Sequence, residues 1–557
     1  MFRATRLLLP DLLDLREEQA FMKNLLPLLA KHGAIVILTA ALPVLAGAAP
    51  KPSGPPVKNL IFEHPRGPSS APKVTGAHLK LSLREAITLA LARNFEIAIE
   101  AHNPRIRQNE VTEEKSAFDP AVRAGADAKK SRADTPSRLF AGGGQQVVSE
   151  QILSAGIVKK TVTGAELSLI FKTIRENSNS RQKFINPDFD SSLTFTISQP
   201  LLKNYGVDVN KAGIRIAAVA FDQSLLAYRG KVISVIERVE LAYWDLVFAI
   251  SNTAFRKKSL DLARDLLRRN RIQVEVGTLA PIEILEAQAA VATREEDLIV
   301  AERTLKDRED VLKKLLNVSG SLSSWRLRIS PADRPVFKPV KIDEMASALR
   351  ALKTRADLES ARLEIEKNKI RLKRDRRNLL PDLDLSASAS NQGVNDSFSN
   401  SIDRQSGNKG YSFSGGLSFR LPFGNREAKA RVGKSRVQLQ QANATYAQLE
   451  QSIIEEVRRS VRRVRTDIKR IQASRLARRL AEDRLDGQEK KYQVGLSTSR
   501  DVLEDQERVA NALTNEVQAL VDYNKSLAQL GRVSYSTLQR FKIQMGDPLK
   551  GDRSAKP

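Results

Sequence analysis

The sequence predicts a duplicated membrane protein of mixed α and β structure, in which an α-helical barrel is capped by a β-barrel. Three observations lead to this prediction. A glycine-centred segment of helical pattern occurs twice, and a segment of alternating apolar and polar residues also occurs twice. The helical stretches between them are too long for a small globular core.

The glycine-centred segment covers residues 262–286 and recurs at residues 480–504, a shift of 218 residues. The shift places Gly277 on Gly495 and Val276 on Val494. Each copy has the pattern of a helix that ends at a glycine, because glycine tolerates the left-handed conformation that closes many helices. A short turn and a second helix follow. We therefore expect two related helical hairpins with a glycine at each tip.

The alternating segment begins after a proline in both copies. Residues 122–128 alternate as a strand with one apolar face requires, and a shift of 261 residues places them on residues 383–389 and Pro120 on Pro381. Further alternating stretches lie at 147–158, 166–173, 191–199 and 417–421. Such strands favour a membrane β-barrel, with a soluble hairpin as the alternative. Because the shifts of 261 and 218 differ by 43, the first repeat has 43 extra residues between its first strand and its tip.

The helical stretches favour an elongated molecule. Residues 83–118 have a helical pattern, and Pro104 within them predicts a kink or a break. Residues 209–276 lack proline and would extend about 100 Å at roughly 1.5 Å per residue. Helices are also expected at 281–316, 342–379, 426–492 and 499–539. Two helices of about 36 residues placed end to end match one long helix, so tips and strand ends should lie at opposite ends of a rod.

The order of these patterns divides the chain into segments. Residues 1–49 have a basic start, an apolar run and small residues, which are typical of a secretory signal peptide, and Met22 is an alternative start. Residues 50–80 are an extended leader, 81–317 the first repeat, 318–341 a linker, 342–539 the second repeat and 540–557 a polar tail.

Composition excludes several classes of protein. The 557 residues include no cysteine, which excludes disulfides, thiolate metal sites and a lipid-anchored cysteine. The formal net charge of +26 would ordinarily suggest nucleic acid or an anionic membrane as partner, but an exported chain is not expected to meet nucleic acid. All four histidines precede residue 103 without metal-like spacing, and residues 142–144 lack the lysine of a phosphate loop. We expect no enzyme activity and no cofactor.

The duplicated order of helix, strands, long helix, tip and helix is specific when combined with short motifs. Each tip reads Val-Gly, five residues, Asp or Glu, one residue, Leu; the strands pass into helices at Ser-Gln-Pro-Leu-Leu (198–202) and Arg-Leu-Pro-Phe (420–423). Over residues 81–538 this pattern resembles the TolC-like outer-membrane efflux proteins. The resemblance implies a homotrimer whose strands share one transmembrane β-barrel in the cell outer membrane and whose helices form a periplasmic tunnel. Four strands per protomer are usual there, and the 43 extra residues leave room for a further hairpin.

The resemblance also implies a passive exit duct in a tripartite efflux or type I secretion system. A periplasmic adaptor protein would dock at the tips and link the duct to an inner-membrane pump that selects the substrate. The tip residues expected to receive the adaptor are Gly277, Thr278, Leu279, Gly495, Leu496 and Ser497. The alternative is an exported basic coiled-coil scaffold that binds polyanions or the envelope surface, although the signal peptide and the duplicated strands count against it.

Acidic residues follow both tip glycines at the same intervals. Glu283 and Glu286 follow the first glycine by six and nine residues, as Asp501 and Glu504 follow the second. Each pair lies on one helix face near a helix N-terminus, where negative charge is stabilised, so ordinary helix-start acids are the alternative interpretation. The resemblance implies that Asp501 and Glu504 surround the periplasmic aperture.

The resemblance further implies that Tyr492 holds the aperture closed by bonding to an acid of the first tip, here Glu283. Ser497 stands where the family often has an arginine that belongs to the same latch. The two tips are unequal, since the first has Pro281 and no tyrosine. We expect the second tip to line the constriction and the first tip to support it.

Two basic segments remain. The run Arg371, Lys373, Arg374, Arg376 and Arg377 ends shortly before Pro381, where the tunnel should meet the membrane. It is expected to face anionic lipid headgroups of the outer membrane and to pair in part with Glu110 and Glu113, with a solvated helix face as the alternative. The arginine-rich stretch 458–479 suits a solvated coiled-coil flank better than a polyanion site.

Overall fold

A computed structural model describes residues 74–75, 78–134, 145–180, 182–318, 325–407 and 410–544 of the chain. The expected signal peptide, most of the leader, the glycines at 142–144 and the end of the polar tail lie outside these residues. The described chain forms two compact units. The sheet unit comprises Thr112–Ile214 and Arg371–Ser435, and the helical unit comprises most of the remainder.

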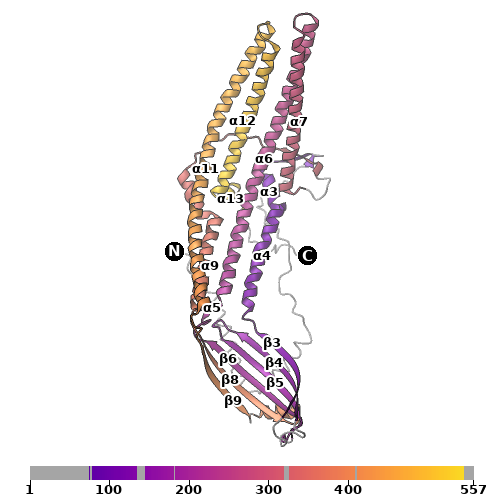
Figure 1. The fold of residues 1–557 in the computed structure, drawn as a ribbon. Helices are drawn as coiled ribbons and strands as arrows, with labels where there is room; N and C mark the ends of the chain where they lie inside the picture. Colours follow the sequence, from indigo (N-terminus) through magenta and orange to yellow (C-terminus); the bar gives the residue numbers. More distant parts are fainter. Residues whose placement is uncertain are drawn as a thin grey trace. The chain divides into compact units, whose positions relative to one another are not determined.

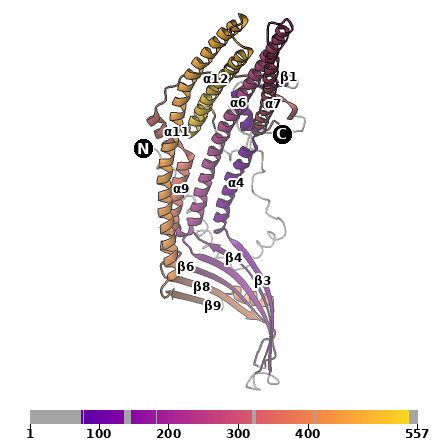
Figure 2. The same cartoon turned by 45° about the horizontal axis from the view of Figure 1, so that its top comes forward.

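The sheet unit contains six antiparallel strands (Figure 1). Their bounds are Ala121–Asp134 (β3), Gln145–Lys160 (β4), Glu166–Ser178 (β5), Asp188–Pro200 (β6), Asp382–Asn395 (β8) and Tyr411–Arg420 (β9). The sheet order is β3-β4-β5-β6-β8-β9, and Figure 2 shows a curved sheet with β3 and β9 at its two edges. Two short helices, Val207–Asn210 (α5) and Phe398–Ser406 (α10), also belong to this unit.

The strands reproduce the duplication expected from the sequence. Both ends of β3 fall on the ends of β8 under the shift of 261 residues. The first repeat contributes four strands and the second contributes two, so the hairpin of β4 and β5 supplies the extra residues of the first repeat. The chain therefore has six strands in this sheet instead of the four that are usual in the family it resembles.

The helical unit is built from two long hairpins and shorter helices beside them. The first hairpin joins Ala212–Glu275 (α6) to Ile282–Leu316 (α7), and the second joins Arg426–Gln493 (α11) to Ser499–Val533 (α12). Figures 1 and 2 show both tips at the same end of this unit. The shorter helices are Leu83–Arg93 (α3), Phe95–Ser116 (α4), Glu344–Thr354 (α8), Ala356–Arg377 (α9) and Thr537–Phe541 (α13). Among the described helices, none combines the length and the apolar character needed to cross a membrane.

The helical unit contains two large hydrophobic clusters. One cluster packs α3 against the middle of α6, with Tyr243 and Leu246 fully buried. A second cluster packs α8 and α9 against α11 and α12, with Val457 and Tyr523 fully buried. The leader and the linker also meet, because His78–Leu81 (β2) pairs with Arg328–Pro331 (β7) in parallel and with Val74–Thr75 (β1) in antiparallel fashion. Neither strand pairing was expected from the sequence.

The break in the first helical stretch lies at Asn94 and not at Pro104, which is buried inside α4. Asn94 adopts an extended conformation, and its side-chain oxygen accepts hydrogen bonds from the backbone of Glu96 (2.9 Å) and Ile97 (3.3 Å). Its amide also donates to the Leu315 carbonyl at 2.8 Å. These bonds satisfy backbone groups at the start of α4 and fix the break at Asn94.

The same break occurs in the second repeat at Arg355, 261 residues further on. The stretch expected as one helix over 342–379 is therefore two helices, α8 and α9. Likewise, the helix expected to end near Gln539 ends at Val533, because Tyr535 has a left-handed φ of 59° before α13 begins. Asn94 and Arg355 share nearly equal backbone angles, so the break is part of the duplicated fold.

Candidate functional site

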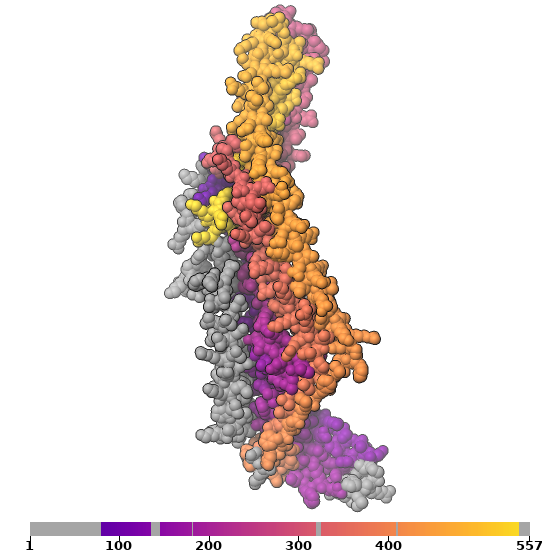
Figure 3. All heavy atoms as spheres, turned by 90° about the vertical axis from the view of Figure 1, so that its left-hand side faces the viewer, coloured from indigo at the N-terminus to yellow at the C-terminus, as the bar shows by residue number. Residues whose placement is uncertain are grey.

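The two hairpin tips have the same backbone geometry. Gly277 has φ of 78° and Gly495 has φ of 77°, both left-handed. The amide after each glycine donates to a carbonyl five residues earlier, Thr278 to Gln273 and Leu496 to Lys491. Each glycine amide donates to the carbonyl three residues earlier, which completes a Schellman motif. The expected hairpins and their glycines are thus observed, and both tips lie at the surface, where Figure 3 shows the second tip uncovered on one face.

The tip turns present apolar side chains to solvent. Val276, Val494 and Leu496 are 66%, 69% and 79% exposed, whereas Leu279 is half-buried. Thr278 donates its hydroxyl back to the Gln273 carbonyl at 3.0 Å and so belongs to the turn itself. Exposed apolar residues gathered at one end of a unit are typical of a contact surface for another protein.

Asp501 completes a capping box with Thr498, the N-cap residue of α12. Its carboxylate accepts hydrogen bonds from the backbone amide (3.1 Å) and hydroxyl (2.8 Å) of Thr498, and from the Ser497 hydroxyl at 3.2 Å. The backbone amide of Thr498 holds the pKa of Asp501 below its ordinary value. Glu504 forms an ion pair with Arg508, one turn further along α12. In a single chain these two acids therefore have the ordinary contacts of a helix start.

Tyr492 joins the two hairpins through a partner that the sequence did not indicate. Its hydroxyl lies 2.9 Å from the side-chain oxygen of Asn270 and 3.0 Å from that of Gln273, and it donates to one of them at a time. Asn270 is fully buried and donates in turn to the Glu283 backbone carbonyl at 3.2 Å. Burial, together with the negative charge of Glu283, raises the pKa of Tyr492.

The carboxylate expected to accept from Tyr492 has another partner. Glu283 accepts a hydrogen bond from the Ser499 hydroxyl at the start of α12. Glu286 is half-buried on the next turn of α7. The tips are thus connected by two contacts, Tyr492 to Asn270 or Gln273 and Ser499 to Glu283, and in both the second hairpin supplies the donor.

A buried arginine links the same hairpins farther from the tips. Arg294 on α7 is 7% exposed and donates to the Leu503 carbonyl (2.7 Å), the Gln506 side chain (3.3 Å) and the Ser259 carbonyl (3.3 Å). Burial lowers the pKa of its guanidinium. Beside it lies a small apolar cluster of Ala263, Leu266, Val502 and Leu503. An arginine in a charged helical segment carries no sequence signal for this role, so the sequence did not identify it.

The basic run before β8 is paired largely within the sheet unit. Lys373 forms an ion pair with Asp208 at 2.5 Å, and Arg374 pairs with Asp375 at 3.2 Å. The Arg377 guanidinium lies 5.8 Å from the ring centre of Tyr205. Arg376 is exposed and Arg371 is half-buried. Glu110, the acid expected opposite this run, forms its ion pair with Arg107 on its own helix at 2.7 Å.

The arginines of 458–479 are largely neutralised inside the helical unit. Arg458 pairs with Glu344 at 2.9 Å, Arg470 with Asp522 at 2.8 Å, and Arg478 with Glu516 at 2.5 Å. A surface whose cations already have carboxylate partners favours a helix-packing role over polyanion binding.

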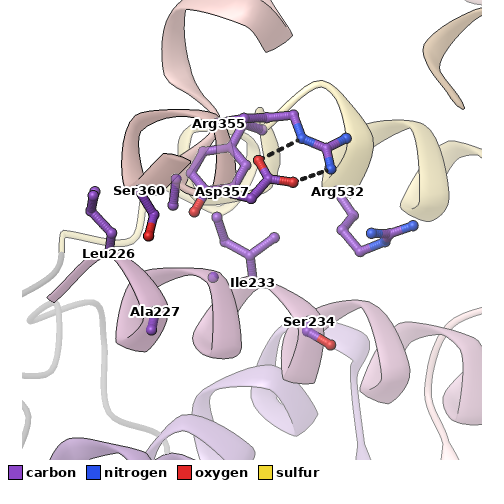
Figure 4. Close-up of a pocket in the computed structure, with 11 residues that line it drawn as sticks. Leu226, Ala227, Ile233, Ser234, Arg355, Asp357, Ser360 and Arg532 are labelled. Carbon is purple, nitrogen blue, oxygen red and sulfur yellow. Dashed lines mark hydrogen bonds and ion pairs between the residues drawn. The ribbon is translucent and has the colours of Figure 1, made fainter. Parts of the chain in front are cut away.

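A charged network also connects the duplicated break to three long helices. Arg355 binds Asp357 and Glu456, each at 2.6 Å, and Arg532 bridges Glu456 (2.7 Å) and Glu237 (2.8 Å). Figure 4 shows the Arg355–Asp357 pair at the wall of a cavity of about 360 Å³. Within the described ranges, no cluster of His, Asp and Glu side chains could hold a metal ion.

One face of the sheet carries an apolar band that crosses all six strands. The continuous registers bring together Val122, Ala124, Ala126, Leu153, Ala155, Ile157, Leu167, Leu169, Phe171, Leu193, Phe195, Ile197, Leu385, Ala387, Ala389, Phe413, Leu417 and Phe419. Several members are well exposed, such as Phe413 at 77% and Leu417 at 64%. The opposite face of β6, β8 and β9 is mainly serine and threonine. This two-faced pattern is typical of strands between lipid and water.

Comparisons with known proteins agree with this geometry. A family model described as outer membrane efflux protein matches residues 86–318 and 349–534. The outer membrane protein TolC of Escherichia coli (strain K12) is 25% identical over 291 residues, which span 51% of this chain and 57% of that protein, less than two thirds of its length.

Solved structures show a similar fold. The CmeC outer membrane channel of Campylobacter jejuni aligns with a TM-score of 0.61 and 14% identity over 84% of this chain and 90% of that one. The outer membrane protein VceC of Vibrio cholerae aligns with a TM-score of 0.61 and 16% identity over 81% and 95%. These likenesses confirm the expected combination of long helices and strands. Because the family model covers more than half of its residues, the chain belongs to the outer membrane efflux protein family.

Proposed function

We propose that three copies of this chain form a passive exit duct through the outer membrane, as part of a tripartite efflux or type I secretion system. The observation that carries this proposal is the apolar band on one face of a six-stranded sheet, opposite a face rich in serine and threonine. Such a sheet suits lipid on one side and a water-filled lumen on the other. Membership of the family supports a channel and not an enzyme.

The edges of the sheet support assembly. β3 and β9 are long edge strands whose residues are all exposed. Exposed edges of this length invite pairing with another chain, and barrel closure removes them. Three such sheets would form a barrel of roughly 18 strands, a size that leaves an aqueous channel. In this proposal each protomer would contribute its six strands to one closed barrel.

The tips are the proposed docking surface for a periplasmic adaptor protein, which would link the duct to an inner-membrane pump. The exposed Val276, Val494 and Leu496 suit a contact with apolar residues of the adaptor. Tyr492, Asp501 and Glu504 would line the closed aperture, with Glu283 and Glu286 behind them. The cargo would be chosen by the pump, because a polar lumen discriminates little between solutes.

Neighbouring residues on opposite sheet faces provide the test. Phe195 lies in the apolar band, and Thr194 points to the other face. An arginine on a lipid-facing strand costs about 2–4 kcal/mol near the middle of the bilayer, whereas a lumen-facing one is tolerated. Phe195→Arg should therefore lower the yield of assembled trimer in outer membranes severalfold, and Thr194→Arg should leave it near normal.

Channel formation is measured on the wild-type protein. Purified protein in planar bilayers should give discrete conductance steps. Equal effects of the two arginine substitutions would contradict a lipid-facing band. Release of the protein from envelopes by high salt, without conductance, would instead favour the basic scaffold that binds polyanions.

A further inference from the structure

Helix α10 follows β8 and precedes β9 in the chain, and it lies against one face of the sheet. It packs against β6 and β8. The Ser401 and Ser191 hydroxyls are 2.7 Å apart, and the Asn391 amide donates to the Gln405 carbonyl at 2.7 Å. Gly393 provides the room, because an added Cβ there would lie 2.2 Å from the Ser401 carbonyl oxygen. The helix is therefore closely fitted to the strands beneath it.

The strand registers show which face of the sheet α10 covers. Ser191 pairs with Thr173 on one side and with Gly393 on the other, in ladders without a bulge. Side chains two residues apart on a strand point to the same face. Ser191 therefore shares its face with Leu193 and Phe195, and α10 lies on the side of the apolar band, at its end.

The helix carries an apolar flank next to that band. Phe398 and Ile402 are four residues apart and lie on one side of α10. Phe398 is 41% exposed and Ile402 is half-buried. The charged Asp403 and Arg404 lie on the exposed remainder of the helix. A helix with one apolar flank and one charged flank is typical of a membrane interface.

We propose that α10 is an interfacial helix whose Phe398 and Ile402 contact lipid acyl chains of the outer leaflet. The proposal rests on the proposed function, since it takes the apolar band to face lipid. α10 connects the strand ends opposite to those that lead into α9 and α11, so it would lie at the outer surface of the membrane. Lipid is the expected occupant because β6 and β8 are inner strands, whereas another copy would pair at β3 and β9.

The absence of cysteine from the sequence makes a labelling experiment clean. Single substitutions Phe398→Cys and Asp403→Cys place a fluorophore on the two flanks of the same helix, and Leu385→Cys places one in the apolar band. Ile402→Cys reports on the same flank if the first variant does not assemble. Each labelled trimer is reconstituted in phosphatidylcholine vesicles, and its fluorescence is quenched by doxyl-labelled phosphatidylcholine or by aqueous iodide.

Lipid quenching at 398 is expected to exceed that at 403 severalfold, and iodide quenching should show the reverse order. Equal iodide quenching at 398 and 403 would overturn the proposal. So would protection of position 398 from both quenchers, which would place another part of the trimer against it. If lipid quenches the label at 385 but not the label at 398, only the proposed role of α10 is refuted. If lipid quenches neither label, the membrane barrel itself is contradicted.

Discussion

Replacing Tyr492 by phenylalanine should raise the resting conductance of the channel. The substitution removes a hydroxyl that lies 2.9 Å from the buried Asn270 oxygen and keeps the ring in its apolar surroundings. A neutral hydrogen bond contributes about 1 kcal/mol net. Three copies that open together would lose about 3 kcal/mol of closed-state stability, which corresponds to roughly a hundredfold change in the opening equilibrium.

The measurement is single-channel conductance in planar bilayers without adaptor. Tyr446→Phe is the matched control, because Tyr446 lies on the same helix α11 but away from the tips. Asn270→Ala should raise the conductance as Tyr492→Phe does, and the double substitution should add little, since both remove the same contact. Wild-type conductance in Tyr492→Phe would refute the assignment of this contact to the closed gate.

Two further predictions concern stability. Arg355→Met should destabilise the helical unit by about 2 kcal/mol, less than for a fully buried pair because Glu456 is 30% exposed, whereas Arg362→Met at an exposed pair should change it little. Burial alone would raise the pKa of Glu456, but hydrogen bonds from Arg355 and Arg532 lower it. The wild type should therefore keep this stabilisation above about pH 4.3 and lose it as the pH falls through the lowered pKa of Glu456. In Arg355→Met, the free energy of unfolding measured in urea should fall less steeply as the pH is lowered. Gly495→Ala should cost about 1 kcal/mol through its left-handed φ, whereas Gly487→Ala inside α11 should stabilise by up to about 1 kcal/mol, as measured by urea unfolding.

The fold was predictable from the sequence wherever periodicity was strong. The duplicated strands at 122–128 and 383–389 follow from the alternation of apolar and polar residues, and the two tips follow from glycines that permit a left-handed turn. Both signals are local properties of the sequence. The helix break at Asn94 was not predictable in this way, because the local signal at Pro104 was stronger. The amide of Asn94 bonds to Leu315, more than two hundred residues away, and such a contact leaves no periodic trace in the sequence.

The candidate site was predictable in position but not in pairing. Matching to the family identified Tyr492 and the tip acids, yet the partner of the tyrosine, Asn270, comes from the buried face of α6, about two turns before the tip glycine. Asn270 is a polar residue in a run of arginines, and nothing local distinguishes it from a solvated residue. Its burial depends on the second hairpin packing against the first, which is a property of the tertiary structure.

The contacts between the two hairpins differ in strength along their length, and this difference suggests where separation begins. At the tips the connection consists of a neutral bond from Tyr492 and a bond from the Ser499 hydroxyl to the charged carboxylate of Glu283, so the Tyr492 bond is the weaker of the two. Arg294 lies twelve residues into α7, about 18 Å from the helix start, and its charged guanidinium donates two bonds to the second hairpin, at Leu503 and Gln506. Bonds that involve a charged group contribute about 1.5–3 kcal/mol, compared with about 1 kcal/mol for neutral ones. An adaptor that pulls on the tips would therefore break the Tyr492 contact first, while Arg294 keeps the hairpins together as the point about which they part.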